Sequence, residues 1–242
     1  MSLRVGLYAA IFFRTSKRIC ASIPHVNTTI LNLYSHSIFI KKNYFKLLKR
    51  LFDIIASFTG IIILLPFLLI IGALMIVTCG FPIFYLQTRV GKNGKDFKLF
   101  KFRTMVKDSD KKGLLTVGGR DPRVTSVGYY LRKYKLDELP QLFNVFFGSM
   151  SLVGPRPEVR KYVDLYNPEQ QQVLFVKPGI TDFASLEFFD ENELLSKSSN
   201  PEETYINEVM PQKLALNRTY IKEQSFLLDL KIIFNTLLKI VK

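Results

Sequence analysis

Two adjacent carboxylates, Asp137 and Glu138, stand in the stretch KYKLDELPQLFN (residues 133–144), between a run of cations and a proline. The pattern favours the start of a helix. Asp137 would be the N-cap, Glu138 would lie at the positive end of the helix dipole, and Pro140 would occupy the first turn, where a missing N–H costs little. Apolar residues then recur at helical spacing up to Gly148, a typical stop. Capping and chemistry are both open interpretations of this acid pair.

The scarcity of histidine and cysteine limits the chemistry that the chain can perform. Its only histidines are His25 and His36, and its only cysteines are Cys20 and Cys79. These are too few for a zinc cage or a disulfide framework, and they provide no credible Ser–His or Cys–His pair in the main body. Any chemistry must therefore come from carboxylates, Lys and Arg, with or without a hard metal ion.

Positive charge is concentrated in the first half of the 242-residue chain. Residues 1–135 contain 23 Lys and Arg against 5 Asp and Glu, whereas residues 136–242 contain 11 against 15. The whole chain carries a net charge of +14. A basic half of this kind suits nucleic acid, anionic lipid headgroups or a phosphorylated substrate, and charge alone does not choose among them.

The basic stretch YLQTRVGKNGKDFKLFKFRTM (residues 85–105) predicts a β-hairpin. An Asn-Gly pair separates its two strand-like runs, which is a strong turn signal. On the second strand, Lys101 and Arg103 share one face because side chains alternate with a period of two. A turn and a basic helix are predicted after the hairpin, and Arg132 lies near the end of that helix.

Arg156 stands between Pro155 and Pro157, whose fixed φ angles hold the loop stiff. A stiff loop leaves the arginine little entropy to lose on binding, and its planar guanidinium can bond two phosphate oxygens at once. A surface arginine in a rigid turn is the alternative interpretation.

The uncharged run of residues 54–88 indicates a membrane segment. As one straight helix it would be about 50 Å long, against a hydrocarbon core of about 30 Å, so it must bend, tilt or stop. Pro66 lies in its most apolar part, where it removes one helical hydrogen bond. Cations flank both ends, which favours a helix that bends at Pro66 and returns to the same leaflet. A spanning helix with a tolerated proline is the alternative.

The stretch SFLLDLKIIFNTLLKIVK (residues 225–242) is helix-like and apolar, but charge interrupts it too often for a membrane span. It can lie at the membrane interface or close the core of the soluble domain. At the other end, residues 1–18 contain no convincing cleavage site, so no secretory signal is predicted.

Taken together, the apolar run with its proline, QTRVGKNGKDFKLFKFRTM, DPRVTSVGYYLRKYKLDELPQLFNV and MSLVGPRPE resemble the bacterial sugar transferases, the monotopic polyprenyl-phosphate phosphoglycosyl transferases. The resemblance implies an α+β membrane-associated fold. A re-entrant, Pro-broken membrane helix would occupy residues 46–88, and a small cytosolic catalytic domain of helices with a β-hairpin would occupy residues 89–242, with interfacial amphipathic helices. Residues 1–45 lie outside the resemblance and form an N-terminal extension of unknown role. Many members have Ser before the proline, whereas this chain has Leu65.

The same resemblance implies an activity. The family transfers a sugar-1-phosphate from a nucleotide sugar, usually a UDP-sugar, to polyprenyl (undecaprenyl) phosphate and releases UMP. Asp137 would be the nucleophile that forms an aspartyl-phosphosugar, and Glu138 would be its partner, both beside a Mg²⁺ ion. The positions that match the family's basic residues around the phosphates are Lys101, Arg103, Arg132 and Arg156.

The expected location is the bacterial inner membrane, with the catalytic domain on the cytoplasmic face and a role in the first membrane step of a surface glycan such as exopolysaccharide or lipopolysaccharide. The expected partners are a UDP-sugar, polyprenyl phosphate and membrane lipid, but no nucleic acid. A glycosyl transferase that releases UDP and a non-enzymatic basic membrane scaffold are the alternatives. Residues 179–200 are acidic and loop-rich, which suits either selection of the sugar or partner, or a solvated surface loop.

Overall fold

The computed structural model describes residues 28–107, 109 and 121–241. The prediction that residues 1–18 hold no secretory signal lies outside these residues, as does most of the predicted 1–45 extension. The chain divides into two compact units, Met1–Leu48 and Lys49–Lys242. The second unit contains every predicted site residue.

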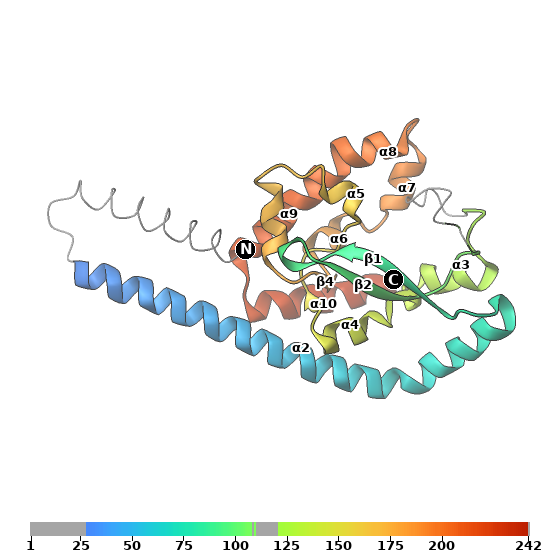
Figure 1. Cartoon of the computed structure of the whole chain (residues 1–242), viewed down its shortest axis with the longest axis horizontal. Coiled ribbons are helices and arrows are strands. Elements are labelled where there is room, and N and C mark those ends of the chain that lie inside the picture. Colours follow the sequence, from blue (N-terminus) through green and yellow to red (C-terminus); the bar gives the residue numbers. More distant parts are fainter. Residues whose placement is uncertain (1–27, 108, 110–120, 242) are drawn as a thin grey trace. The chain divides into compact units, whose positions relative to one another are not determined.

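One long helix, α2 (Thr28–Cys79), begins in the first unit and continues into the second. The elements that follow it are β1 (Phe84–Val90), a 3₁₀ turn (Lys92–Gly94), β2 (Asp96–Phe102), α3 (Ser126–Lys133), a 3₁₀ turn (Leu136–Glu138), α4 (Gln141–Phe147), β3 (Ser151–Val153), α5 (Arg160–Val163), a 3₁₀ helix (Gln170–Phe175), β4 (Gly179–Thr181), α6 (Phe183–Glu187), α7 (Glu191–Ser196), α8 (Pro201–Thr204), a π-helical turn (Tyr205–Val209), α9 (Met210–Glu223) and α10 (Phe226–Val241). The fold is therefore helix-rich and mixed, as predicted (Figure 1).

The segment Tyr44–Cys79 of α2 is long and apolar enough to cross a membrane, and only 17% of its most apolar window is buried. A helix so exposed differs from the buried core helix of a soluble protein. The helix runs through Pro66 without interruption, so the predicted break is not seen there. Instead the C-terminal part of α2 curves along the second unit (Figure 1). A proline removes only one hydrogen bond, which a helix can absorb by bending.

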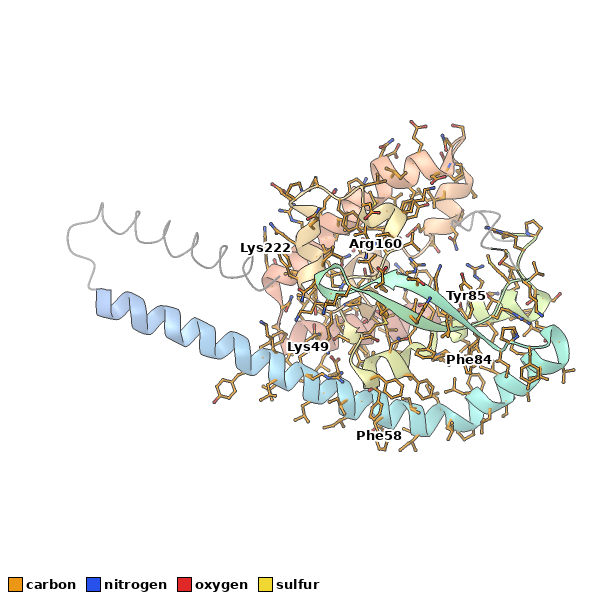
Figure 2. All side chains as sticks on the ribbon, in the orientation of Figure 1. Lys49, Phe58, Phe84, Tyr85, Arg160 and Lys222 are labelled. Carbon is orange, nitrogen blue, oxygen red and sulfur yellow. The ribbon has the colours of Figure 1, made fainter. Side chains whose placement is uncertain are left out.

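Within the second unit, one stripe of α2 packs against the hairpin and α3. Leu68, Ile71 and Met75 recur at helical spacing and are buried with Phe102 and Leu131. The opposite face is apolar but open, and apolar side chains project from the outer edge of the helix around Phe58 (Figure 2). The strongly exposed members of this outer face include Ile63, Leu69, Ile70 and Val77.

Polar side chains fix both ends of this part of α2 to the same unit. Lys49 pairs with Asp229 of α10, and Arg50 donates to two carbonyls at the C-terminal end of α4 at 2.7 and 2.9 Å. Asp53 accepts a backbone N–H from β3 at 3.0 Å and a serine hydroxyl of the same strand at 3.2 Å. At the far end, Arg103, the residue after β2, donates to the carbonyls of Cys79, the last residue of the helix, and Gly80.

The predicted hairpin is confirmed. Strands β1 and β2 pair antiparallel, from Val90 opposite Asp96 to Phe84 opposite Phe102. Asn93 and Gly94 both have positive φ, at 58° and 72°. Asn and Gly tolerate this left-handed conformation best, which is why the pair is a strong turn signal.

A second, parallel pair of short strands was not predicted. Ser151 of β3 lies opposite Gly179 of β4, and Val153 lies opposite Thr181. The two backbones approach so closely that a Cβ at Gly179 would lie 2.1 Å from the nitrogen of Gly154. Residues 179–200 hold β4, α6 and α7, so the description of this segment as loop-rich was wrong.

Helix α10 has two different faces. Ile232 is buried with Val153 of β3 and Tyr220 of α9, so one face closes the core. The other face leaves large apolar side chains exposed, among them Leu227, Phe234 and Leu237. The core interpretation of residues 225–242 is therefore confirmed for one face, and the outer face has the composition of an interfacial helix.

Candidate active site

The predicted site residues converge on one cavity of about 910 Å³ in the second unit. Its walls come from α2, β1, β2, α3, the segment from Lys135 to Leu142, the loop after β3, the region of α6 and α7, and α10. The predicted residues that line it are Lys101, Arg103, Arg132, Asp137, Glu138 and Arg156.

The acid pair is carried by a tight turn. Asp137 and Glu138 lie inside the 3₁₀ turn Leu136–Glu138, in which the N–H of Glu138 donates to the carbonyl of Lys135 at 3.2 Å. The α-helix that follows begins only at Gln141, and no side chain caps it. The prediction that Asp137 is a helix N-cap was therefore wrong, because the turn moves the N-cap position three residues on, to Pro140. The predicted stop is confirmed, with Gly148 in the left-handed conformation.

Asn144 of α4, the helix that follows the acid pair, holds this helix against β2. Its side-chain oxygen accepts the N–H of Phe100 at 2.9 Å, and its amide nitrogen donates to the carbonyl of Lys98 at 2.7 Å. Asn144 is buried, so both bonds are shielded from water. This side chain therefore sets the distance between α4 and β2, the strand that carries Lys101 and that Arg103 directly follows. Sequence analysis missed it because an asparagine on a helix gives no signal of a partner 44 residues away.

Glu138 is held by two cations. Lys101 donates to Oε1 at 3.0 Å, while Arg156 donates to Oε2 at 3.1 Å through Nη1 and to Oε1 through Nη2. Burial alone would raise the pKa of the Glu138 carboxyl, but Arg156 and Lys101 hold it well below its usual range. Burial also lowers the pKa of the Lys101 ammonium, which Glu138 opposes. Glu138 is thus ionised at neutral pH.

Asp137 differs from its neighbour. It is buried and lines the cavity, yet its carboxylate makes no hydrogen bond or ion pair with any residue that the structure describes. Burial raises the pKa of this carboxyl, an effect that Lys101 opposes and Glu138 reinforces. A carboxylate in this state keeps its lone pairs available and lies among cations that can hold a phosphate.

The loop of Arg156 is fixed by Asp182, a residue that sequence analysis missed. One oxygen of Asp182 accepts the backbone N–H of Arg156 at 3.3 Å, and the other caps α6 through Ser185 at 2.8 Å. The buried Asp182 therefore holds this loop in addition to the two prolines, which alone predicted that the loop is stiff. Only the parallel pairing of β3 with β4 brings Asp182 to this loop, and short strands leave little trace in a sequence.

Arg103, just after β2, and Arg132 of α3 both line the cavity. The Nη2 of Arg103 donates to the carbonyls of Cys79 and Gly80 at the end of α2. Its Nη1 is buried without a partner among the described residues. An unpaired buried donor is costly unless a ligand meets it. Arg132 lies in the last turn of α3, as predicted. The four predicted cations therefore line the same cavity as the acid pair, and two of them, Lys101 and Arg156, bind Glu138 directly.

A further polar cluster, centred on Glu158, lines the same cavity. Glu158 accepts the hydroxyl of Tyr205 at 2.8 Å and a guanidinium N–H of Arg89 at 3.4 Å. Burial and Glu158 raise the pKa of the Tyr205 hydroxyl, so it remains a donor. Sequence analysis did not single out these residues, although Glu158 belongs to the MSLVGPRPE motif.

The donor set suits a Mg²⁺ ion. No group of three or more His, Cys, Asp or Glu gathers among the described residues, so a cage made only of protein ligands is not seen there. Mg²⁺ usually takes one or two carboxylates and completes its shell with water and substrate phosphate. Asp137 has both oxygens available, and Oε2 of Glu138 accepts a single bond, which leaves it a lone pair. The two carboxylates therefore fit a magnesium ion that arrives with a phosphorylated substrate.

Comparison with known proteins identifies the family of the chain. Residues 44–242 match the model of the family described as Bacterial sugar transferase. The chain is 36% identical over 193 residues to the UDP-N-acetylgalactosamine-undecaprenyl-phosphate N-acetylgalactosaminephosphotransferase of Aeromonas hydrophila, covering 78% of this chain and 43% of that protein. It is 40% identical over 196 residues to the UDP-glucose:undecaprenyl-phosphate glucose-1-phosphate transferase of Klebsiella pneumoniae, covering 79% and 39%.

A shorter relative is matched over most of its length. The uncharacterised sugar transferase EpsL of Bacillus subtilis is 38% identical over 199 residues, which cover 80% of this chain and 87% of that protein. The chain thus spans about two fifths of the first two relatives and nearly all of this one. The chain belongs to the bacterial sugar transferase family.

Proposed function

We propose that this protein transfers a sugar-1-phosphate from a UDP-sugar to undecaprenyl phosphate and releases UMP. The observation that carries the proposal is the buried Asp137 carboxylate, which lines a cation-rich cavity without a hydrogen bond or ion pair to any described residue. The names of two relatives, an N-acetylgalactosaminephosphotransferase and a glucose-1-phosphate transferase, support the same reaction class.

The cavity cations prepare the donor for attack. A diphosphate repels a carboxylate until its charge is neutralised, and fixed cations in a water-poor site do this without reorganisation. Lys101, Arg132 and Arg156 line the cavity around the acid pair, and Arg103 offers its unpaired Nη1. When bound by Asp137 and Glu138, Mg²⁺ supplies further neutralisation of the phosphate oxygens.

Two displacements at phosphorus complete the reaction. An oxygen of Asp137 forms a bond to the sugar-bearing phosphorus, while the bond from that phosphorus to the bridging oxygen breaks and UMP leaves with the electron pair. An oxygen of undecaprenyl phosphate then attacks the same phosphorus and breaks its bond to Asp137, which restores the carboxylate. Glu138, ionised and clamped by Arg156 and Lys101, keeps both cations in position.

The contacts of α2 support a re-entrant arrangement. A polar cluster near Lys49 and the carbonyls at Cys79 and Gly80 are bound by the same compact unit. From Asp53 to Cys79 a straight helix measures about 39 Å, which exceeds a hydrocarbon core of about 30 Å. A spanning helix would force that unit to hold both membrane surfaces at once. We infer that residues 46–88 enter and leave by the cytoplasmic leaflet of the bacterial inner membrane, that residues 89–242 form the cytosolic catalytic domain, and that the outer face of α10 lies at the interface.

A donor panel assayed without acceptor tests the proposed function. The 242-residue protein in detergent or nanodiscs, given Mg²⁺ and the correct UDP-sugar, should release UMP up to one equivalent and gain one phosphosugar by intact-protein mass spectrometry. Release of UDP in place of UMP would identify a glycosyl transferase. If no donor yields a nucleotide product while the protein binds anionic vesicles in a salt-sensitive way, a membrane scaffold is the better description.

A further inference from the structure

Lys135 has a backbone conformation that its side chain disfavours. Among the described residues, positive φ angles outside glycine occur only at Asn93 and Lys135. Asn93 belongs to the Asn-Gly turn of the hairpin, where this conformation is expected. Lys135 has φ 56° and ψ 19°, two residues before Asp137. Strained residues of this kind cluster at functional sites, because the surrounding structure must hold them in place.

This conformation builds the turn that carries the acid pair. The N–H of Lys135 donates to the carbonyl of Arg132 at 3.1 Å, and its own carbonyl accepts the N–H of Glu138 at 3.2 Å. Glycine would adopt the same angles without strain. The presence of a long cation in its place therefore calls for a role of the side chain.

Lys135 lines the cavity, and no described carboxylate lies within ion-pair distance of its ammonium, although Asp137 and Glu138 attract it from farther away. Lys135 lines the same cavity as Asp137, and its Nζ lies 5.6 Å from the ring centroid of Phe189. No hydrogen bond or ion pair joins this ammonium to any residue within the described part of the chain. Lys101 and Arg156, by contrast, are both bound to Glu138. Lys135 can therefore meet a ligand without first giving up an ion pair.

Phe189 holds the ammonium near the acid pair only weakly. Its ring is also met by Lys239 of α10, at 5.3 Å from the centroid, and Lys239 donates to the carbonyl of Leu186. A contact between an ammonium and an aromatic ring is much weaker than a charged hydrogen bond to phosphate in a site with little water. The ring contact thus places the ammonium in the cavity, and a phosphate oxygen can replace this contact at little cost.

We propose that Lys135 binds a substrate phosphate in this cavity, with its ammonium moving from the ring of Phe189 to a non-bridging phosphate oxygen. The inference rests on the proposed function for the identity of the substrate, which offers two phosphate sources, the diphosphate of the UDP-sugar and the phosphate of the acceptor. The binding chemistry itself needs only an ammonium, a phosphate and the cavity that both occupy.

Lys135→Met tests this role, with Lys133→Met as a matched control. Met keeps an unbranched side chain and the same backbone cost at positive φ, so the melting temperature should not change. Lys133 also lies over an aromatic ring, at 5.5 Å from the centroid of Tyr134, but it is not among the residues that line the cavity. Lys135→Met should lower kcat/KM at least tenfold, because a charged hydrogen bond to phosphate is lost. Lys135→Arg should stay within about threefold of wild type, and Lys133→Met should match wild type.

Two kinetic arms separate the phosphate sources. A slower UMP burst without acceptor assigns Lys135 to the donor diphosphate, and an unchanged burst with a raised KM for undecaprenyl phosphate assigns it to the acceptor. Wild-type values for Lys135→Met in both arms would overturn the inference while the proposed function stands.

Calorimetric titration with Mg²⁺ and UDP gives a readout that needs no turnover. If the wild-type protein releases UMP from no donor, the proposed function fails, and weaker UDP binding by Lys135→Met alone would still support a phosphate-binding lysine. Equal UDP affinity of Lys135→Met, Lys133→Met and wild type in that situation would refute it.

Discussion

The guanidinium of Arg156 binds both carboxylate oxygens of Glu138, a residue 18 positions earlier in the chain. Nη1 donates to Oε2 at 3.1 Å and Nη2 donates to Oε1, which also accepts the ammonium of Lys101. The stiff loop around Arg156 therefore positions Glu138 before any phosphate arrives. The guanidinium of Arg156, whose two parallel donors would also suit a phosphate, thus fixes the position of the Glu138 carboxylate.

Arg156→Lys should impair catalysis although the charge is kept. A point cation cannot bond both oxygens at once, so Glu138 loses its fixed position and a phosphate loses its fork. We expect kcat/KM to fall by a factor that corresponds to about 2 kcal/mol in steady-state UMP assays. Arg160→Lys is the matched control, because Arg160 is an exposed arginine that pairs with Asp96 outside the cavity (labelled in Figure 2). If Arg156→Lys and Arg160→Lys have equal kinetics, Arg156 is only a surface arginine in a rigid turn.

Glu138→Gln should lower both activity and stability. Gln leaves the partly buried Lys101 and Arg156 without their shared anion, which is costly. Arg156 and Lys101 lower the pKa of Glu138 against the effect of burial, so its ionised form stabilises the fold above the unfolded-state pKa near 4.5. This stabilisation is lost as the pH falls below that value toward the folded-state pKa. The difference in melting temperature between wild type and Glu138→Gln should therefore be largest at neutral pH and shrink in acid.

Asp137→Asn should remove the reaction but keep the fold. Without a nucleophile, both the UMP burst and the phosphosugar adduct should disappear, whereas Glu138→Gln should still form its adduct on Asp137 at a lower rate. Because burial raises the pKa of Asp137, the ionised carboxylate costs stability at neutral pH. A neutral Asn removes that cost, so its melting temperature should equal or exceed that of wild type. Normal turnover by Asp137→Asn would require direct attack by the polyprenyl phosphate instead.

Local signals predicted the parts of this fold that depend on neighbours in sequence. The Asn93-Gly94 turn fixed the hairpin, Gly148 ended α4, and Arg132 was correctly placed near the end of a basic helix. The meeting of these segments in one cavity was expected only from the resemblance to a family. Periodicity assigns a residue to a face of its own element, but it does not say which element lies opposite.

The features that sequence analysis missed or predicted wrongly share one cause, because each depends on contacts between segments that are distant in the sequence. Asp137 has the sequence signature of an N-cap, yet the left-handed Lys135 closes a 3₁₀ turn that delays the helix. The flanking cations Lys49 and Arg50 entered the sequence analysis only as positive charges beside the apolar run, and their bonds to residues nearly a hundred positions away or more could not be predicted. The anchor at Asp182 depends on a parallel strand pair too short to recognise. Each of these features is decided by tertiary structure.

Lys101→Met should move the pH dependence of the first half-reaction. Asp137 must be ionised to attack phosphorus, so the UMP burst rate should fall in acid. Burial raises the pKa of Asp137, and Lys101 partly offsets this. Removing the ammonium therefore raises that pKa further and shifts the acid limb of the burst rate to higher pH. Rapid-quench measurement of UMP across pH 4 to 8 checks the shift, and Arg160→Lys serves as the control with an unmoved limb.

The last prediction concerns the two flanks of the apolar helix. In a background with Cys20 and Cys79 replaced by Ser, single cysteines at Lys46 and Lys92 should both resist an impermeant thiol reagent in intact bacterial cells. Both should react once the cells are permeabilised. The physical reason is that the Lys49 and Asp53 contacts and the Arg103 contact with the helix end belong to one compact unit, which can lie on only one side of the bilayer.

A third cysteine at Ile70, an exposed apolar position of α2, separates burial in lipid from a failed assay. It should stay unlabelled before permeabilisation and react slowly afterwards, because thiolates form poorly in hydrocarbon. Labelling of exactly one flank from outside would show that α2 spans the membrane. In that case the contacts of Lys49 and Arg103 could not both exist in the membrane-bound protein, and the polar anchors at one end of α2 would have to open.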